Sequence, residues 1–409
     1  MENLSHSLAG LAAGELLQRS LSPEPTVEAQ SVRRRLLLVA CAVAGNLPDL
    51  DLVLTKLLPA PLGYLLHHRG HTHTLLFLLP QALALIALIL ALWPSARRLL
   101  RSSSQARLGL AGATAIGLLL HLLMDYFNSY GLHPFYPLDS HWFYGDTVFI
   151  VEPVFWVSFG VPLAVMVQRR WLRITWLALL AGGIGLAGAI GFLHPASLIG
   201  LALGAGVLGA VQQRAGFAGR QALVAGWIAA AVFVAWQGWA SNSGRQQLTA
   251  HLHRLEPTNQ LLDAAMTPSP ANPVCWSFVS VERNDGAGVF TIRRGILSLA
   301  PTLIPAGSCP ALGDPSPGAA ANGAILMTLE DSQPLASLQA LAANCHFRDW
   351  MRFARMPRLT NGVASDARFP DGASNFSTFD PAAFAGLPCL KGVPQWEPPR
   401  EDLLEQGGT

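Results

Sequence analysis

Residues 67–93 read HHRGHTHTLLFLLPQALALIALILALW, so four histidines stand directly before a long apolar run. A run of about 20 apolar residues can cross the hydrocarbon core of a bilayer as a helix. Imidazoles near lipid cost free energy unless polar groups pair with them. The stretch therefore predicts a membrane protein in which a transmembrane helix, Thr74–Trp93, begins beside a polar site.

The composition divides the chain into two parts. The 409 residues are 51% hydrophobic and 13% charged, with a mean hydropathy of +0.36, which is far more apolar than an ordinary soluble domain. Nearly all long apolar runs fall in residues 1–240, whereas residues 241–409 are rich in Pro, Gly, Ser and Asn. We therefore expect a polytopic membrane domain over 1–240 and a soluble domain over 241–409. The net charge of +2 and the lack of a basic stripe give no sign of a nucleic-acid partner.

Apolar segments in the first part are candidates for membrane helices. The first two are shorter than the about 20 residues of a spanning helix, so they either cross a thinned bilayer or form a hairpin that dips into it. The candidates are Leu4–Leu17, Leu36–Leu47, Thr74–Trp93, Leu108–Met124, Val148–Val167, Ile174–Leu193, Ala196–Val211 and Ala222–Ala240. The predicted fold is an α-helical membrane protein with about 6–8 transmembrane or half-membrane helices, followed by a smaller β-rich or α+β soluble domain.

Arginines mark alternate connections between these segments. The positive-inside rule makes these connections cytoplasmic. They contain Arg33, Arg34 and Arg35, then Arg97, Arg98, Arg101 and Arg107, then Arg169, Arg170 and Arg173, then Arg214 and Arg220. The predicted chain is a multi-pass protein of the plasma membrane whose C-terminal domain is extracytoplasmic. Because connections alternate between the two sides of the membrane, the remaining polar segments fall on the outer face. These are His6, Asp49, Asp51, residues 67–73 and residues 125–152.

Histidines and carboxylates on that face are a suitable ligand set for zinc or a similar divalent ion. His121 and Asp125 are four residues apart on a predicted helix and share one face, although a salt bridge between them would explain the pair equally well. Pro48 should end a helix and present Asp49 and Asp51 in an extended or turn geometry, for which the alternatives are helix capping or a solvated turn. The histidine cluster has its own alternative, interfacial residues at a helix start.

The same residues carry a family resemblance. The sequence resembles the membrane-bound metal-dependent hydrolase family of YdjM-type bacterial inner-membrane proteins over roughly residues 1–160. The matching pieces are His6 with Leu8-Ala9-Gly10, Asn46-Leu47-Pro48-Asp49-Leu50-Asp51, His68-Arg69-Gly70-His71-Thr72-His73-Thr74, and His121-Leu122-Leu123-Met124-Asp125 before Ser129-Tyr130-Gly131. The resemblance implies that the metal ligands or their neighbours are His6, Asp49, Asp51, His68, His73, His121 and Asp125. It places His67 and His71 in more variable positions.

A metal-dependent hydrolase at the outer membrane face is the predicted function, acting on a phosphoester or ester of a lipid or amphipathic substrate. One or two ions are expected, with zinc as the first choice. Seven candidate ligands exceed the four that a single structural zinc takes, which favours two ions, or one ion whose ligands are supported by the remaining residues. Asp51, Asp146 or Glu152 would serve as general base. Arg69 would hold an anionic group, or alternatively extend toward the lipid headgroups. A metal-stabilised scaffold and a transporter remain the alternative functions.

The C-terminal part contains Cys275, Cys309, Cys345 and Cys389, whereas Cys41 lies alone in an apolar segment. Four cysteines in an extracytoplasmic domain predict two disulfides, with three possible pairings, against free buried thiols. β-Branched and aromatic residues on both sides of the turn-like Asn284-Asp285-Gly286 predict a hairpin of Val274–Val281 and Gly288–Leu299. The other expected elements are a strand at Ala324–Leu329, a loop at Pro310–Asn322 and a helix at Ser332–Ala343.

Overall fold

The computed structural model describes residues 1–310, 323–372, 375–397 and 400–404. The chain forms two compact units. The first unit contains residues 1–50, 72–128 and 148–236, and the second contains 51–71, 129–147 and 237–409. The second unit therefore includes two segments from the apolar, N-terminal part of the sequence.

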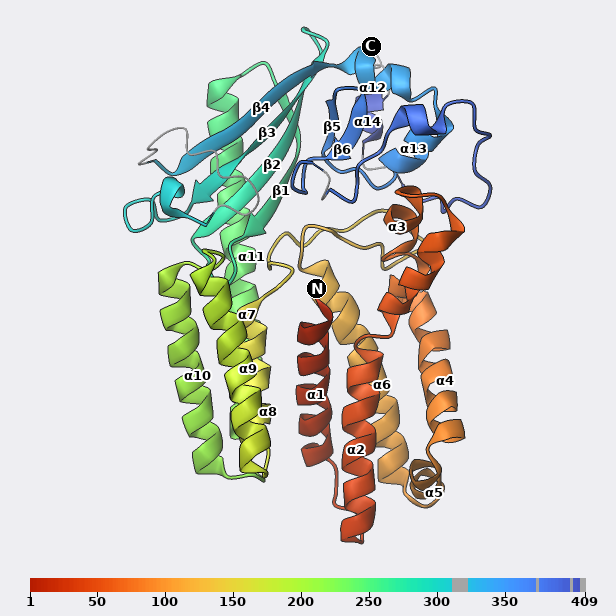
Figure 1. The fold of residues 1–409 in the computed structure, drawn as a ribbon, viewed down its shortest axis with the longest axis vertical. Coiled ribbons are helices and arrows are strands. Elements are labelled where there is room, and N and C mark those ends of the chain that lie inside the picture. The colour runs from red at the N-terminus through yellow and green to blue at the C-terminus, as the bar shows by residue number, and fades with distance from the viewer. Residues whose placement is uncertain (311–322, 373–374, 398–399, 405–409) are drawn as a thin grey trace. The chain divides into compact units, whose positions relative to one another are not determined.

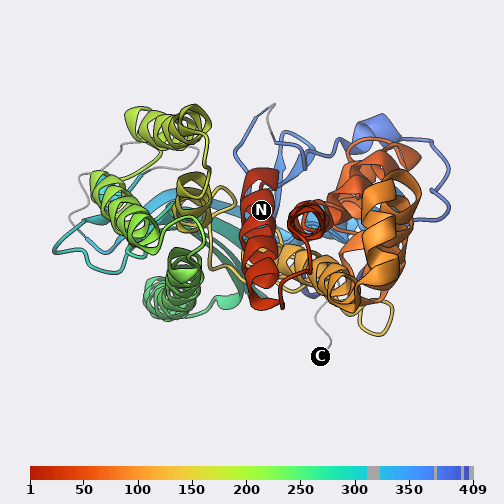
Figure 2. The same cartoon turned by 90° about the horizontal axis from the view of Figure 1, so that it is seen from below.

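Helices build the first unit (Figures 1 and 2). Each apolar run expected from the sequence contains a helix, although Val148–Val167 becomes helical only from Pro153 and Leu36–Leu47 only as far as Ala44. The predicted helical membrane region is therefore confirmed. The helices are α1 (Asn3–Ser20), α2 (Val27–Ala44), α4 (Leu75–Leu92), α5 (Pro94–Ser102), α6 (Ser104–Tyr126), α7 (Pro153–Phe155), the π-helical turn η3 (Trp156–Gly160), α8 (Val161–Val165), α9 (Arg170–Ala189), α10 (Pro195–Ala215) and the start of α11 (Gln221–Leu255). In the described part of the chain, 6 helices are long and apolar enough to cross a membrane.

Close contacts between α1, α2 and α6 depend on glycine. A Cβ at Gly10 of α1 would lie 2.8 Å from the carbonyl oxygen of Cys41 on α2, and one at Gly117 of α6 would lie 2.5 Å from the same oxygen. Real Cβ atoms do not approach an oxygen so closely, so both helices can pack on α2 only without side chains at these positions. The three helices lie side by side in both views (Figures 1 and 2).

Short 3-10 segments follow α2 and precede α4. Helix α2 ends at Ala44, with Gly45 as its C-cap, and Pro48–Leu57 forms the 3-10 segment η1. The extended or turn geometry expected for Asp49 and Asp51 is therefore wrong, because both lie in a helical segment. The second 3-10 turn, η2 (His71–His73), stands directly before α4.

A four-stranded antiparallel sheet lies in the second unit (Figure 1). The predicted hairpin is confirmed, since β2 pairs with β3 in register from Cys275 opposite Ser298 to Asn284 opposite Val289. The predicted third strand is also confirmed, but it continues to Pro334, so the helix expected from Ser332 begins only at Leu335. The loop expected at Pro310–Asn322 lies outside the described residues from 311 onward. The strands are β1 (Gln260–Pro268), β2 (Cys275–Asn284), β3 (Val289–Ser298) and β4 (Ile325–Pro334), with a separate pair β5 (Pro357–Thr360) and β6 (Val363–Asp366).

Helix α11 continues to Leu255, well beyond the expected end at Ala240. Its apolar residues Ala240, Leu248 and Leu252 are spaced by multiples of four and therefore share one face. This face packs on the buried side chains of Trp276 and Phe278 from the sheet. Packing against the sheet gives a polar helix end a buried face, which the average hydropathy of the segment did not indicate.

An aromatic core holds the segments of the second unit together. Trp350 and Trp396 are completely buried in it. The indole nitrogen of Trp396 donates a hydrogen bond to the carbonyl oxygen of Leu66 at 2.9 Å, which ties residue 66 in α3 (Leu62–His67) to the C-terminal region. The remaining helices of this unit are α12 (Leu335–Leu341), α13 (Cys345–Met351) and α14 (Glu401–Leu404).

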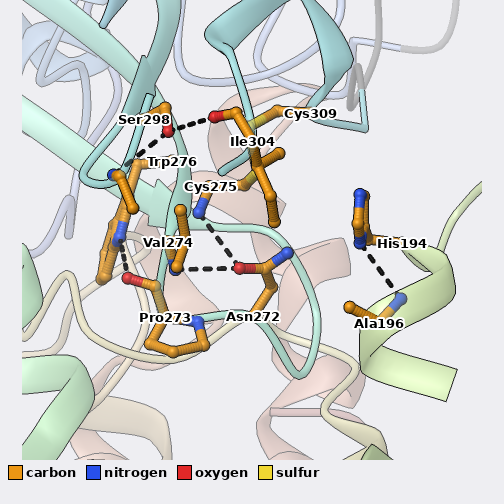
Figure 3. The surroundings of a disulfide bond; sticks show 11 residues. His194, Ala196, Asn272, Pro273, Val274, Cys275, Trp276, Ser298, Ile304 and Cys309 are labelled. Carbon is orange, nitrogen blue, oxygen red and sulfur yellow. Dashed lines mark hydrogen bonds between the residues drawn. A yellow bond between two sulfur atoms is a disulfide. The ribbon is translucent and has the colours of Figure 1, made fainter. Parts of the chain in front are cut away.

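Two disulfides join Cys275 to Cys309 and Cys345 to Cys389, so the expected pair of bridges is confirmed and consecutive cysteines are partners. Figure 3 shows the first bridge beside a tight turn, in which Oδ1 of Asn272 accepts hydrogen bonds from the backbone nitrogens of Val274 and Cys275. Cys41 is a free, buried thiol. The bridges close loops of 34 and 44 residues in the second unit.

Candidate metal site

Four side chains of the first unit form a group that could hold a metal ion. Asp49, His73, His121 and Asp125 each offer one ligand atom, and these atoms all lie within 4.8 Å of one another. Asp49 keeps 12% of its side chain exposed, and the other three are buried. A neutral imidazole pair with two carboxylates is a donor set that suits zinc and other divalent first-row ions.

Three elements supply these residues. Asp49 comes from η1, His73 from η2, and His121 and Asp125 from consecutive turns of α6. The prediction that the α6 pair shares one helix face is confirmed, because Nε2 of His121 lies 3.5 Å from Oδ2 of Asp125. The side chain of Gln81 donates a hydrogen bond to the carbonyl oxygen of Thr72 at 2.7 Å, which fixes the η2 turn on α4.

The nitrogen–oxygen distances within the group match those around a tetrahedral ion. Ligand atoms bound at about 2.0–2.2 Å lie roughly 3.3–3.6 Å apart when the four bonds are tetrahedral. Nε2 of His73 lies 3.5 Å from Oδ1 of Asp49 and 3.3 Å from Oδ2 of Asp125. Nε2 of His121 lies 3.6 Å from the same oxygen of Asp49 and 3.0 Å from Nε2 of His73. The residues therefore fit a single four-coordinate ion.

The ring of His121 is oriented by the end of α2. Its Nδ1 lies 2.8 Å from the carbonyl oxygen of Gly45. Because a carbonyl oxygen can only accept, Nδ1 carries the proton and, in the neutral ring, Nε2 presents a lone pair to the group. Such hydrogen bonds from the second ring nitrogen are the usual way in which proteins fix a metal-binding histidine.

His6 supports the group without belonging to it. Its Nε2 lies 3.3 Å from Oδ1 of Asp125, the oxygen that does not face His73 and His121. The rings of His6 and His121 are stacked with their centroids 4.1 Å apart. His6 is therefore placed to hold the carboxylate of Asp125 and the plane of His121, both of which face the candidate ion.

In the second unit, the carboxylate of Asp51 contacts both His68 and Arg69. Nδ1 of His68 lies 3.0 Å from Oδ1 of Asp51, and the backbone nitrogen of Arg69 donates to Oδ2 of Asp51 at 2.8 Å. The guanidinium of Arg69 is buried over the ring of Tyr130, 4.6 Å from its centroid, and donates to the carbonyl oxygen of Gly131. Arg69 is thus packed inside protein and does not extend to a headgroup layer.

Other residues considered from the sequence have structural contacts. Glu152 is buried and caps α7, with Oε1 accepting from the backbone nitrogen of Val154 at 3.1 Å. Asp146 pairs with Arg355 and Arg245 in the second unit. Burial lowers the pKa of His67, which belongs to the second unit and not to the four-residue group.

Asp139, His141 and Glu397 form a second group of possible ligands in the second unit. Nδ1 of His141 lies 2.7 Å from Asp139 and 3.0 Å from Glu397, and the hydrogen bond to Asp139 raises the pKa of His141. The imidazole is largely exposed, with 62% of its surface accessible. Mutual ion pairing on a solvated surface accounts for this group.

Sequence reasoning missed the residues that bring the elements of the site together. Gly10 and Gly14 lie four residues apart on α1, and Gly117 is the glycine of α6 that lies close to the backbone of α2. Small residues at this spacing are a known signal for close helix packing in membranes, so the pattern was readable. The carbonyl of Gly45 had no readable signal, because it depends on where α2 ends.

Comparisons with known proteins agree with the site's location in the N-terminal half. Residues 1–195 match the family model described as YdjM inner membrane protein. The uncharacterized protein YfhP of Bacillus subtilis (strain 168) is 25% identical over 179 residues, which are 44% of this chain and 50% of that relative. No solved structure matches the chain. The family resemblance predicted from the sequence is confirmed by this match, which covers residues 1–195.

Proposed function

We propose that the protein is a membrane-embedded hydrolase that depends on a divalent metal ion, zinc being the first choice. The observation that carries the proposal is the convergence of Asp49, His73, His121 and Asp125, whose ligand atoms lie within 4.8 Å of one another. An ion held there would supply Lewis acidity that activates water and polarises a phosphoryl or carbonyl oxygen. A metal-stabilised scaffold would use the same ligands without turnover.

Residues around the group have distinct tasks in this proposal. Asp49 is its most exposed member, so the substrate would approach from its side. His6 holds Asp125, and the carbonyl of Gly45 holds His121, so that both ligands keep their orientation. Glu152 is the general-base candidate of the first unit. Asp51, His68 and Arg69 belong to the second unit, and we propose for them a contribution to a second ion or to an anionic group.

A lipid or another amphipathic ester is the proposed substrate class. Directly after His73, the helix α4 exposes the apolar side chains of Leu75, Leu76 and Leu79. A helix that is apolar on its outer surface is suited to lipid contact. The ligand His73 thus lies next to the apolar outer surface of α4. A polar site beside an apolar surface suits a substrate with a polar head and an apolar tail. We also propose that this edge and the C-terminal domain face away from the cytoplasm.

The first experiment measures the metal content of the full-length, detergent-solubilised protein, purified without chelators, by inductively coupled plasma mass spectrometry. We expect about one equivalent of a divalent metal, as four donors complete a tetrahedral set. His73→Ala and His121→Ala should each lose it. His253→Ala is the matched control, because this histidine is exposed and lies outside the ligand group.

A second experiment separates hydrolase from scaffold. The metal-loaded protein is incubated with phosphodiester and lipid-ester substrates, and product is measured before and after removal of the metal. Activity that disappears with the metal, and in His73→Ala, but persists in His253→Ala supports the hydrolase. Stoichiometric metal without any turnover would identify a scaffold, and absence of stoichiometric metal would refute the metal site itself.

A further inference from the structure

An open cavity of about 770 Å³ lies in the first unit, at the end of α1 that is remote from the ligand group. Glu15, Arg19, Arg34 and Arg169 contribute its charged surface. Glu15 follows His6 by nine residues on α1, which corresponds to about 13 Å along a helix. The cavity is therefore separate from the candidate metal site.

Glu15 holds two arginines at the wall of this cavity. The carboxylate is buried, with 1% of its side chain exposed. Its Oε1 accepts from Nε of Arg19 at 2.7 Å, and its Oε2 accepts from Nε of Arg34 at 2.8 Å. Arg19 also donates to the carbonyl oxygens of Phe217 and Gly219. One carboxylate thus fixes two guanidinium groups that carry more charge than it neutralises.

Hydrogen-bonding capacity remains on the arginines. In the described part of the chain, the terminal nitrogens of Arg34 make no hydrogen bond, and 51% of its side chain is exposed. Arg169 is exposed and forms no ion pair with any described residue. Three arginines against one carboxylate leave the lining with a charge of +2. Guanidinium groups bind phosphate through two parallel hydrogen bonds, so the cavity is suited to a phosphate group.

Apolar side chains complete the lining. Leu11, Leu38, Leu163 and Trp176 border the same cavity. Trp176 belongs to α9, whose outer surface exposes Ile174 and Leu179. A free phosphate ion would gain nothing from such a wall, whereas the glycerol and upper acyl chain of a lipid would bury apolar surface against it. Arginine-rich membrane ends are also the side on which anionic headgroups attract basic residues.

We propose that this cavity binds the phosphate headgroup of an anionic phospholipid. Arg34 and Arg169 contact the phosphate, Glu15 with Arg19 keeps Arg34 in position, and the leucines and Trp176 contact the lipid's apolar part. The bound lipid would join α1 and α2 to α8 and α9 at this end of the first unit.

Native mass spectrometry of the full-length protein in detergent tests the site, with dioleoyl phosphatidylglycerol as the probe and dioleoyl phosphatidylcholine as the neutral lipid. We expect the double variant Arg34→Gln/Arg169→Gln to raise the Kd for phosphatidylglycerol at least tenfold. Arg98→Gln/Arg101→Gln is the matched control, because it removes two exposed arginines of α5 that do not line the cavity. Its Kd should stay within twofold of the original protein.

An equal increase in the Kd for phosphatidylglycerol in the cavity and control variants would overturn the site. Equal affinity for the two lipids would overturn it as well. Inorganic phosphate that displaces the lipid at the same concentration would show an anion site without lipid. Helicity and elution volume check folding, and Arg169→Gln alone, which removes no described hydrogen bond, should still raise the Kd measurably. Metal content is measured alongside, so failure of the lipid site is distinguishable from failure of the metal site.

Discussion

Nε2 of His73 lies 3.0 Å from Nε2 of His121 in the first unit. Two imidazole nitrogens at this distance share either a proton or a cation, since two facing lone pairs would repel each other. Nδ1 of His121 already faces the carbonyl oxygen of Gly45, so the proton of the neutral ring is on that side. The pair is thus arranged so that a cation bound by both rings can replace a proton of His73.

Asp125→Asn should lower metal affinity more than His6→Ala does. Asp125 supplies one of the four ligand atoms, whereas His6 only contacts its other oxygen. Loss of a residue that orients a ligand typically lowers affinity about 10–100-fold, and loss of the ligand should exceed this. Competition with a chelating dye measures both. Asp285→Asn, an exposed carboxylate outside the group, is the control; equal affinity in all three variants would contradict the assignment.

His68→Ala distinguishes one ion from two. The four candidate donors of the first unit would complete a tetrahedral set, so we expect the variant to retain one equivalent of metal. His68 and Asp51 contact each other in the second unit, and they are the remaining candidates for a second ion. Elemental analysis decides: a fall from two equivalents to one identifies a second ion, whereas loss of all metal would show that His68 binds the first.

Gly117→Val should separate α6 from α2 and weaken the metal site. Its Cβ would lie 2.5 Å from the carbonyl oxygen of Cys41, so the backbones must move apart. Overpacking of this kind costs about 1–3 kcal/mol. We expect a lower midpoint of thermal unfolding in detergent, together with reduced metal content. Gly206→Val on α10 is the control, because nothing lies within 4 Å of its Cβ; a similar effect in both variants would reject the packing explanation.

Local features of the sequence predicted local features of the structure. The spacing of His121 and Asp125 placed both on one face of α6, and the turn residues around Asn284 predicted the β2–β3 hairpin. What depended on tertiary packing could not be predicted. The extension of α11 is stabilised by Trp276 and Phe278 of the sheet, and residues 51–71 belong to the core of the second unit, despite their place among membrane segments.

The choice among the seven proposed ligands shows the same limit. Asp49 and Asp51 are two residues apart and chemically identical, yet Asp49 joins His73 and His121 while Asp51 contacts His68. Both residues lie in the 3-10 segment η1, and the sequence indicated only that Pro48 would interrupt a helix. A family resemblance names such residues without separating their roles.

The two disulfides should differ in their sensitivity to reductant. Cys275 and Cys309 are buried, whereas Cys389 is exposed. Because exchange requires access to sulfur, we expect mild reductant to open Cys345–Cys389 first. Alkylation followed by peptide mass spectrometry measures the order. Removal of this bridge by Cys345→Ala/Cys389→Ala should cost about 4 kcal/mol for a loop of 44 residues. Simultaneous opening of both bridges would contradict the expected order.

Asp263 should make the stability of the second unit depend on acid pH. Burial by itself would raise the pKa of this carboxyl, but Arg355, whose Nε donates to it at 2.8 Å, and the nearby Arg400 and Arg245 hold the pKa below its ordinary value. A lowered pKa in the folded state contributes stability above the unfolded pKa of about 4, and this contribution is lost as pH falls through the folded pKa. The carboxylate thus stabilises the fold at neutral pH.

Asp263→Asn tests this directly through thermal unfolding of the full chain, followed by near-ultraviolet circular dichroism between pH 3 and pH 7. We expect the free energy of unfolding to fall by on the order of 3 kcal/mol at neutral pH, because one partner of a largely buried ion pair is removed. The difference from the original protein should shrink below about pH 4, where the carboxyl of the unfolded chain begins to protonate while the native carboxylate stays charged. Asp285→Asn breaks an exposed pair with Arg283 and should cost less than about 1 kcal/mol at every pH. A loss in Asp263→Asn that stays constant down to pH 3 would show that the contact with Arg355 stabilises the fold through packing and not through its charge.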